Sequence, residues 1–213
     1  MKPLSLTKPH IIVMLGIPSS GKTFFAEQFA TTFHTPFIHY AKLAKLSGLS
    51  STGIHKIVAY QLRELLKTKQ SIIIEGFAES RADRTALTKR AHSAGYEVLY
   101  VWVQTDPNAA MQRAVRSLAQ EGKRTMSARQ YEQQANTFVM PLATDSVAVI
   151  SGKHTFASQV KTVLNKLTAP RAEAASRTTP ARRTVSEPKT KTATKSTAKP
   201  TPKSRGRRSV TVE

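Results

Sequence analysis

The sequence VMLGIPSSGKTFFAEQ, which runs from Val13 to Gln28, contains the segment that decides the fold. An apolar run typical of a buried strand ends at Gly16, and a helical pattern begins at Lys22. Between them, GIPSSGKT fits the phosphate-loop (Walker A) pattern G-x-x-x-x-G-K-[ST]. Glycines let the backbone approach a phosphate closely, and amide hydrogens at the start of the helix point at the anion. The stretch therefore predicts a nucleotide phosphate site between a strand and a helix.

The residues of this loop are expected to divide the work of binding a nucleotide. Lys22 would reach the β- and γ-phosphates, and Thr23 would offer its hydroxyl to Mg²⁺. The predicted cofactors are therefore ATP, or another nucleoside triphosphate, and Mg²⁺. An ordinary Gly-Ser turn is the alternative, but the position after an apolar strand and before a helix favours the phosphate site. The loop residues expected to contact the nucleotide are Gly16, Ile17, Pro18, Ser19, Ser20, Gly21, Lys22 and Thr23.

Strand and helix patterns alternate over residues 1–168, which we expect to form one nucleotide-binding domain. Besides the strand at 11–15, apolar runs predict strands at 36–40, 71–75, 97–103 and 147–150. Helical spacing and capping residues predict helices at 22–32, 53–66, 82–94, 106–119, 127–140 and 156–167. Strands that alternate with helices predict an α/β fold with a mostly parallel sheet of about five strands.

An acid ends one of these strands. The run SIIIE places Glu75 at the carboxyl end of a buried strand, where side chains of a parallel sheet face the ligand crevice. Such an acid organises Mg²⁺, directly or through a water, or handles a proton or water. A helix-capping or solvated glutamate is the alternative. We expect Glu75 to act beside the phosphates.

Arginines follow the apolar run at 97–103. Arg113 and Arg116 lie three residues apart and share a helix face, and Arg124 and Arg129 follow in the polar stretch AQEGKRTMSAR. This pattern resembles a short lid whose arginines close over phosphates and neutralise their charge. A solvated basic face is the alternative. The candidate catalytic residues are Lys22, Glu75, Arg113 and Arg116, and the lid residues expected to contact the nucleotide are Arg113, Arg116 and Arg124.

Taken together, these motifs resemble P-loop kinase-like proteins of the polynucleotide-kinase, zeta-toxin and gluconate-kinase type, a group that also carries the description AAA family ATPase. The resemblance spans roughly residues 11–167 and includes GIPSSGKT, IIIEG, the strand GYEVLYVWV with TDP, and QRAVR. It implies a parallel sheet of order 2-3-1-4-5 with a small lid. It also implies that Arg81 or Arg84, which open one helix, face the acceptor, and that Arg113 or Arg116 face the donor phosphates.

The chain departs from these kinases after the second strand, where they usually carry an Asp that takes the proton of the acceptor hydroxyl. Here the segment PFIHYAKL has no carboxylate. His39 is one candidate base, because imidazole titrates near neutral pH, although a lone histidine at a strand end is more often structural. Glu75 and Asp83 are the other candidates; otherwise the protein binds and slowly hydrolyses ATP. The basic residues of this acceptor side, which suit a phosphorylated or nucleic-acid acceptor, are Lys42, Lys45, Lys56 and Arg63.

Residues 169–213 have a different composition, with twelve Lys and Arg, three Glu and almost no apolar residues. Such a segment cannot bury enough surface to offset its ordering entropy, so we expect it to be disordered. Basic tails of this kind bind polyanions without sequence specificity, which makes nucleic acid the expected partner. A solubilising tail is the alternative, and an anionic membrane or ribosome surface is another partner of suitable charge. The residues expected to bind the polyanion are Arg182, Arg183, Lys189, Lys191, Lys195, Lys199, Lys203, Arg205, Arg207 and Arg208.

Composition excludes some classes of protein and leaves two functions open. The formal net charge is +20 and there is no cysteine, which excludes disulfides and thiolate metal sites. No apolar run is long enough to span a membrane, and we expect a cytoplasmic protein whose oligomeric state the sequence leaves open. The favoured function is ATP-dependent phosphoryl transfer to a small molecule or nucleic acid. The alternative is a nucleic-acid-binding protein whose nucleotide domain is a switch or a weak ATPase.

Overall fold

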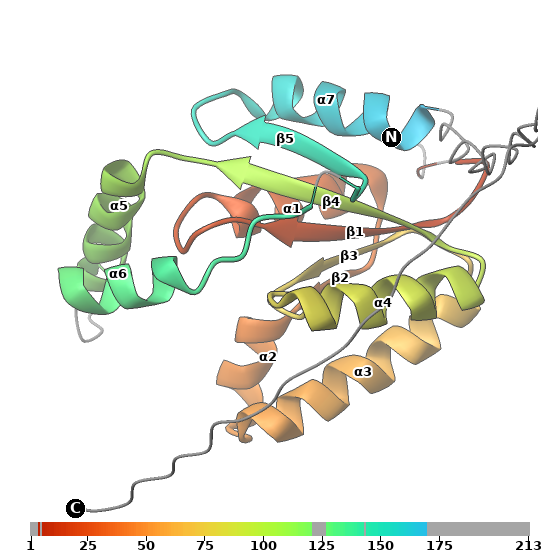
Figure 1. Cartoon of the computed structure of the whole chain (residues 1–213), viewed down its shortest axis with the longest axis horizontal. Coiled ribbons are helices and arrows are strands. Elements are labelled where there is room, and N and C mark those ends of the chain that lie inside the picture. The colour runs from red at the N-terminus through yellow and green to blue at the C-terminus, as the bar shows by residue number, and fades with distance from the viewer. Residues whose placement is uncertain (1–3, 5, 121–126, 143, 170–213) are drawn as a thin grey trace, which may run out of the picture. The chain divides into compact units, whose positions relative to one another are not determined.

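The computed structural model describes residues 4, 6–120, 127–142 and 144–169 (Figure 1). All of them belong to one compact unit, Met1–Arg171. The lid residue Arg124 and, apart from Ala169, the basic segment 169–213 lie outside the described residues, so the expectations for them stay predictions. Within the described part, no helix is both long and apolar enough to cross a membrane.

The described residues contain one five-stranded sheet, and every strand pair in it is parallel. The strand order is β2 (Phe37–His39), β3 (Ile72–Glu75), β1 (His10–Leu15), β4 (Glu97–Gln104) and β5 (Val147–Ser151). This confirms the predicted α/β class and the order 2-3-1-4-5. Because β1 pairs with strands on both sides and is covered on both faces, its residues from Ile11 to Leu15 are all buried. The buried position explains the continuous apolar run.

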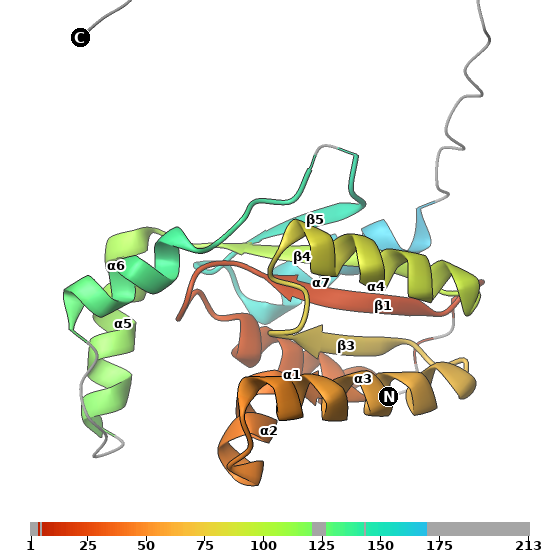
Figure 2. The ribbon, with the colours of Figure 1, turned by 60° about the horizontal axis from the view of Figure 1, so that its bottom comes forward.

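Helices cover both faces of the sheet. The helices of the described residues are α1 (Lys22–Phe33), α2 (Tyr40–Ser47), α3 (Ser51–Lys67), α4 (Arg81–Ser93), α5 (Pro107–Gln120), α6 (Ala128–Asn136) and α7 (Phe156–Thr168). Alternate residues of β1 enter two separate cores, because strand side chains alternate between faces. Ile11 and Val13 pack with α3 and α4, and Ile12 and Met14 pack with α1 and α7. In Figures 1 and 2, α5 and α6 lie beyond the carboxyl ends of β1 and β4.

Three local expectations need correction. The helix expected at 127–140 ends at Asn136. The expected strand at 36–40 ends at His39, because a helix that the sequence analysis did not predict, α2, begins at Tyr40. This helix has no buried residue and no side-chain cap, so neither apolar periodicity nor a capping residue indicated it. Helix α3 starts two residues earlier than predicted, at Ser51, because the Ser50 side chain accepts a hydrogen bond from the Gly53 amide.

Candidate phosphate-transfer site

The loop between β1 and α1 adopts a backbone shape that glycine makes possible. Gly16 has φ 142°, and a Cβ there would lie 2.7 Å from the Val103 carbonyl oxygen and 2.9 Å from the Ser20 hydroxyl. Gly21 has φ 105°, and Ser19, at φ 55°, also lies in the left-handed region. A side chain at position 16 would collide with its neighbours, so the first glycine of the motif is required by the packing of the loop.

Helix α1 begins without a side-chain cap. Gly21 occupies its N-cap position, and among the described residues no side-chain cap hydrogen bond forms there. By contrast, Ser80, Ser127 and Thr155 cap α4, α6 and α7 with their hydroxyl groups. The first amides of a helix have no partner within the helix. At α1 they remain available to an anion bound in the loop.

The side chain of Lys22 folds back over the loop. Its Nζ donates hydrogen bonds of 2.9 Å to the carbonyl oxygens of Gly16 and Ile17. Burial lowers the pKa of Lys22, while the negative charges of Glu75 and Glu79 act in the opposite direction. A phosphate in the loop would give this buried ammonium group an anionic partner in place of the two carbonyls.

Three predicted site residues meet at the carboxyl ends of β2 and β3. Thr23 donates its hydroxyl to Glu75 Oε1 at 3.0 Å, and His39 Nε2 lies 3.9 Å from Glu75 Oε2. The parallel register places His39 opposite Glu75 on neighbouring strands. Within the described residues, Glu75 Oε2 and His39 Nδ1 are buried without a hydrogen-bond partner. Buried polar atoms are seldom left unpaired, so these two are suited to a ligand.

The donors at this point fit Mg²⁺. The ion prefers oxygen ligands and usually combines one or two protein oxygens with phosphate oxygens and waters. Thr23 offers a hydroxyl and Glu75 a carboxylate whose second oxygen is unpaired within the described residues. No cluster of three or more His, Cys, Asp or Glu occurs among the residues that the structure describes. A metal held by the protein alone is therefore less suited to these residues than Mg²⁺ bound together with a nucleotide.

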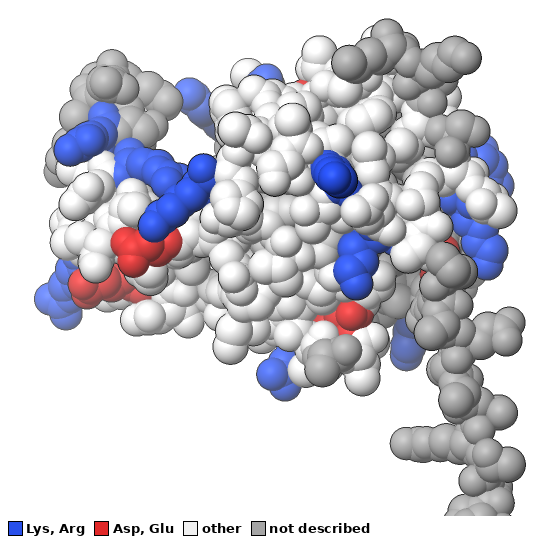
Figure 3. Space-filling model, turned by 90° about the horizontal axis from the view of Figure 1, so that it is seen from above, with Lys and Arg blue, Asp and Glu red and all other residues white. Residues whose placement is uncertain are grey.

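Helices α5 and α6 form the described part of the predicted lid. Arg113 and Arg116 on α5 and Arg129 on α6 are exposed. On the face shown in Figure 3, basic and acidic side chains gather at the end that carries these helices, and much of the central surface is uncharged. These exposed arginines stay predicted, from the sequence pattern, to close over a nucleotide.

Tyr131 on α6 joins the lid to the phosphate loop, which the sequence analysis did not predict. Its hydroxyl donates a hydrogen bond to the Pro18 carbonyl oxygen at 3.3 Å. The ring is buried among Ala110, Ala114 and the partly buried Ile17. Ala110 and Ala114, four residues apart on α5, leave space for the Tyr131 ring. This pair of small residues was the sequence feature that could have predicted the contact.

A cavity of about 200 Å³ lies between the loop, the end of β3 and α6. Its lining includes Gly16, Lys22 and Gln134, together with Glu79, which the sequence analysis did not single out. Glu79 follows the strand end by four residues and lines the same cavity as Lys22, and its negative charge acts to raise the pKa of Lys22. The cavity therefore contains an acid that the motif pattern alone did not indicate.

The predicted acceptor-side arginines have different environments. Arg84 is buried, and its guanidinium donates to the carbonyl oxygens of Glu79, Val139 and Met140. These contacts hold two segments together and do not support a place facing an acceptor. Arg81 is exposed beside a separate cavity on α4.

Asp83, proposed as a substitute base, instead belongs to a helix cap. Its carboxylate accepts hydrogen bonds from the Ser80 amide at 3.4 Å and the Ser80 hydroxyl at 2.6 Å. The two residues form the capping box of α4. This explains the presence of the acid without a catalytic role.

The sheet order, the phosphate loop and the lid helices define the fold of P-loop kinases. Similar solved structures include a gluconokinase from Sinorhizobium meliloti 1021 (TM-score 0.55, 19% identity, 75% of this chain and 91% of that chain). An APS kinase from Mycobacterium tuberculosis, solved with AMPPNP and APS, is also similar (TM-score 0.54, 13% identity, 75% and 98%). So is a chain of an RNA repair complex (TM-score 0.54, 16% identity, 62% and 45%). At these identities the likeness concerns the fold.

The family is given by the sequence. The family model for zeta toxin matches residues 34–166, more than half of the chain, and the protein therefore belongs to the zeta toxin family. The matched range begins after the phosphate loop, so the loop is an independent observation. No curated protein matches the chain.

Proposed function

We propose that the protein is an Mg²⁺-dependent phosphotransferase, which moves the γ-phosphate of ATP to a hydroxyl group on a small-molecule or nucleic-acid acceptor. The observation that carries this proposal is the contact between Thr23 of the phosphate loop and Glu75 of the neighbouring strand. The contact joins two residues that are 52 positions apart in the sequence, and it lies at the carboxyl ends of the strands, where the uncapped helix α1 begins. Membership of the zeta toxin family and the kinase fold support the same activity.

The residues of the loop and the lid act on the phosphates. Lys22 exchanges its two carbonyl partners for the β- and γ-phosphates when ATP binds. Arg113 and Arg116 neutralise charge that develops on the transferred group when the lid closes. Thr23 and Glu75 would hold Mg²⁺, which neutralises phosphate charge and orients the γ-phosphate.

In the transfer step, the acceptor oxygen forms a bond to the γ-phosphorus while the bond to the β–γ bridging oxygen breaks. ADP leaves with the electron pair, and the acceptor proton passes to a basic group. His39, Glu75 and Glu79 are the groups near this point that can take it. We place His39 and Arg81 on the acceptor side.

The test is a transfer screen with ATP labelled at the γ-phosphate. The acceptors are sugars, nucleosides and oligonucleotides with a free 5′-hydroxyl, and phosphate release is measured alongside. Transfer to an acceptor that stops when EDTA removes Mg²⁺ supports the proposal. Label that moves only to water would reduce the protein to an ATPase, and no movement of label would contradict the proposal outright.

A matched pair of threonines on α1 controls for folding. Thr23→Val removes the hydroxyl that contacts Glu75 and should lower turnover about 100-fold. Thr31→Val removes a hydroxyl that, within the described residues, bonds the Glu27 carbonyl oxygen in the second half of the helix, so turnover should not change. Equal effects of the two substitutions would mean that Thr23 acts through the stability of α1.

A further inference from the structure

Two adjoining hollows lie between α3 and its neighbours α2 and α4. One, of about 390 Å³, is lined by residues of α2 and α3, and the other, of about 200 Å³, by residues of α3 and α4 and by Phe77. Both share His55 and Ala59, so they form one groove along α3. Figures 1 and 2 show α2, α3 and α4 on the same side of the sheet. We call this the ring groove; its defining residues are Tyr40, His55, Lys56, Phe77 and Arg90.

Three rings lie in contact along this groove. The ring centroids of His55 and Phe77 are 4.5 Å apart with an interplanar angle of 31°, and those of Tyr40 and His55 are 6.3 Å apart at 67°. The Tyr40 hydroxyl donates to the Ser51 carbonyl oxygen at 3.0 Å, which fixes that ring. His55 is exposed, and the other two rings are partly exposed. Such rings provide flat surfaces on which nucleic-acid bases stack.

The charge around the groove is positive. No Asp or Glu occurs between Glu27 and Glu64, a stretch that contains all of α2 and most of α3. A further ring, Tyr60, is 59% exposed on α3, and the Arg63 guanidinium lies 5.0 Å from its centroid. Two cations, Lys56 and Arg90, line the groove itself. Lys42 and Lys45 on α2 and Arg63 on α3 add positive charge to the same helices, although Arg63 Nε also lies 3.5 Å from Glu64 Oε1.

The acid that lines the groove is already engaged. Asp83 accepts hydrogen bonds from the Ser80 amide and hydroxyl at the start of α4. Asp83 keeps its negative charge, but its carboxylate is held within the helix cap, and the cation Arg90 lines the same hollow. A ligand that complements the groove carries negative charge and flat rings together.

The groove reaches the carboxyl edge of the sheet. Tyr40 directly follows His39 at the end of β2, and Phe77 follows Glu75 of β3 by two residues. A chain lying on the rings would therefore pass beside the candidate phosphate-transfer site. The basic segment 169–213 differs from the groove in composition, because it has no aromatic residue on which a base could stack.

We propose that the ring groove binds single-stranded nucleic acid, with bases stacked on His55 and Phe77 and phosphates next to Lys56 and Arg90. The rings favour this partner over an acidic protein, because carboxylates complement the cations but leave the ring faces unused. Binding here needs no ATP and goes beyond the proposed phosphoryl transfer. Lys22→Ala, which removes the phosphate-loop ammonium group, should therefore leave it unchanged.

Photocrosslinking of the full chain locates the binding site. The probe is a thymidine oligomer of about 12 nucleotides with one 5-iodouracil, and the crosslinked peptides are identified by mass spectrometry. Crosslinks in the peptides that carry Tyr40, His55 or Phe77 support the proposal. Crosslinks confined to residues 169–213, or none, would overturn it.

Affinity measurements on the full chain separate stacking from charge. By fluorescence anisotropy with the same oligomer, His55→Ala should weaken binding about tenfold. Lys56→Glu should weaken it and reduce the salt dependence by about one phosphate contact. Lys161→Glu, an equal charge change at an exposed position of α7, is the matched control and should have little effect. Equal losses for both lysines, or equal competition by polyglutamate, would show that charge alone drives binding and would refute the proposal.

Discussion

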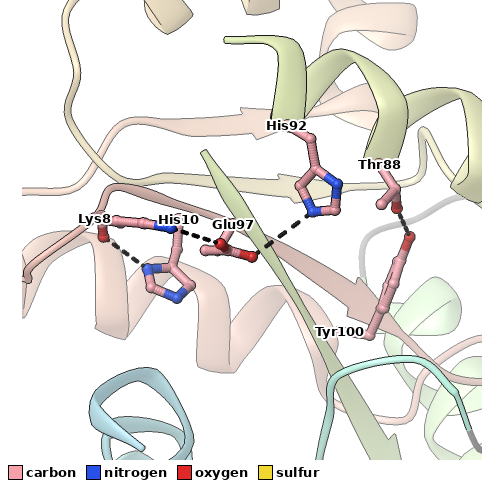
Figure 4. A network of polar contacts seen from close by, with 6 residues as sticks. All are labelled: Lys8, His10, Thr88, His92, Glu97 and Tyr100. Atoms are coloured by element: carbon pink, nitrogen blue, oxygen red, sulfur yellow. Dashed lines mark hydrogen bonds and ion pairs between the residues drawn. The ribbon is translucent and has the colours of Figure 1, made fainter. Parts of the chain in front are cut away.

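At each end of the sheet a glutamate lies close to a histidine, and the two pairs differ in how well they are satisfied. At the carboxyl end, His39 Nε2 is 3.9 Å from Glu75 Oε2, and the side chains are only 20% and 10% exposed. At the amino end, His92 Nε2 is 3.7 Å from Glu97 Oε2, with side chains 43% and 25% exposed. Glu97 also contacts Lys8 Nζ at 3.3 Å (Figure 4).

The difference indicates that the His39–Glu75 pair belongs to a candidate binding site and that the His92–Glu97 pair is a structural contact. Within the described residues, the carboxyl-end pair leaves two buried polar atoms without partners. The amino-end network shown in Figure 4 includes a paired carboxylate and a hydrogen bond of 2.9 Å between Thr88 and Tyr100. A buried unpaired acceptor is unfavourable by about 1–3 kcal/mol, so it persists where a ligand supplies the missing partner. We therefore expect substitutions at the carboxyl end to affect activity and those at the amino end to affect stability.

The largest expected effect is that of substituting Lys22 at the carboxyl end, and Lys8 at the amino end is its control. Lys22→Ala should weaken ATP binding about 100-fold, because it removes the cation that would contact the phosphates. Lys8→Ala removes a cation that contacts Glu97 and should leave ATP affinity unchanged. Isothermal titration with Mg²⁺ and ATP measures both variants. Wild-type affinity in Lys22→Ala would refute the assignment of the loop.

Substitution of Glu75 should lower turnover, whereas the same substitution of Glu97 should not. Glu75→Gln keeps an oxygen that can accept from Thr23 but removes the charge for Mg²⁺, so we expect turnover to fall about 100-fold. Its melting temperature should change little, because the amide keeps the shape of the side chain and removes a buried charge, while its NH₂ group takes the position of the unpaired oxygen. Glu97→Gln should keep full turnover. The comparison fails if Glu75→Gln unfolds the protein while turnover per folded molecule stays normal.

What the sequence predicted depended on local patterns. The strands were predictable because each interior strand is an unbroken apolar run, and the phosphate loop because its glycines and lysine have fixed spacing. Thr23 and Glu75 were both singled out, but their contact depends on the pairing of β1 with β3, which no local pattern encodes. The role of Arg84 was missed for the same reason, since two of its partners lie 55 and 56 residues away.

Arg84 provides a buried charge that is well satisfied, in contrast to Glu75. Arg84→Ala should lower the free energy of unfolding by about 3 kcal/mol, because three hydrogen bonds from its buried guanidinium are lost. Arg81→Ala, on the same helix but exposed, should change it by less than about 0.5 kcal/mol. Urea denaturation measures both. Similar small values for the two arginines would show that the Arg84 contacts do not stabilise the fold.

The smallest expected effect is the pH dependence of the amino end. Burial lowers the pKa of His10 from its ordinary value of 6.5 and the charge of Lys8 lowers it further, while the hydrogen bond to the Lys8 carbonyl oxygen and the charge of Glu97 oppose the shift. Because the unfolded chain then binds the proton more tightly, stability falls as the pH drops through 6.5.

Between about pH 7.5 and pH 5.5, the loss of melting temperature should be smaller in His10→Asn, which keeps a donor for the Lys8 carbonyl. His34→Asn, at an exposed left-handed position that asparagine tolerates, is the control and should melt with the wild-type pH profile. If His10→Asn loses as much stability as wild type over this range, the acid sensitivity of the amino end arises from another group.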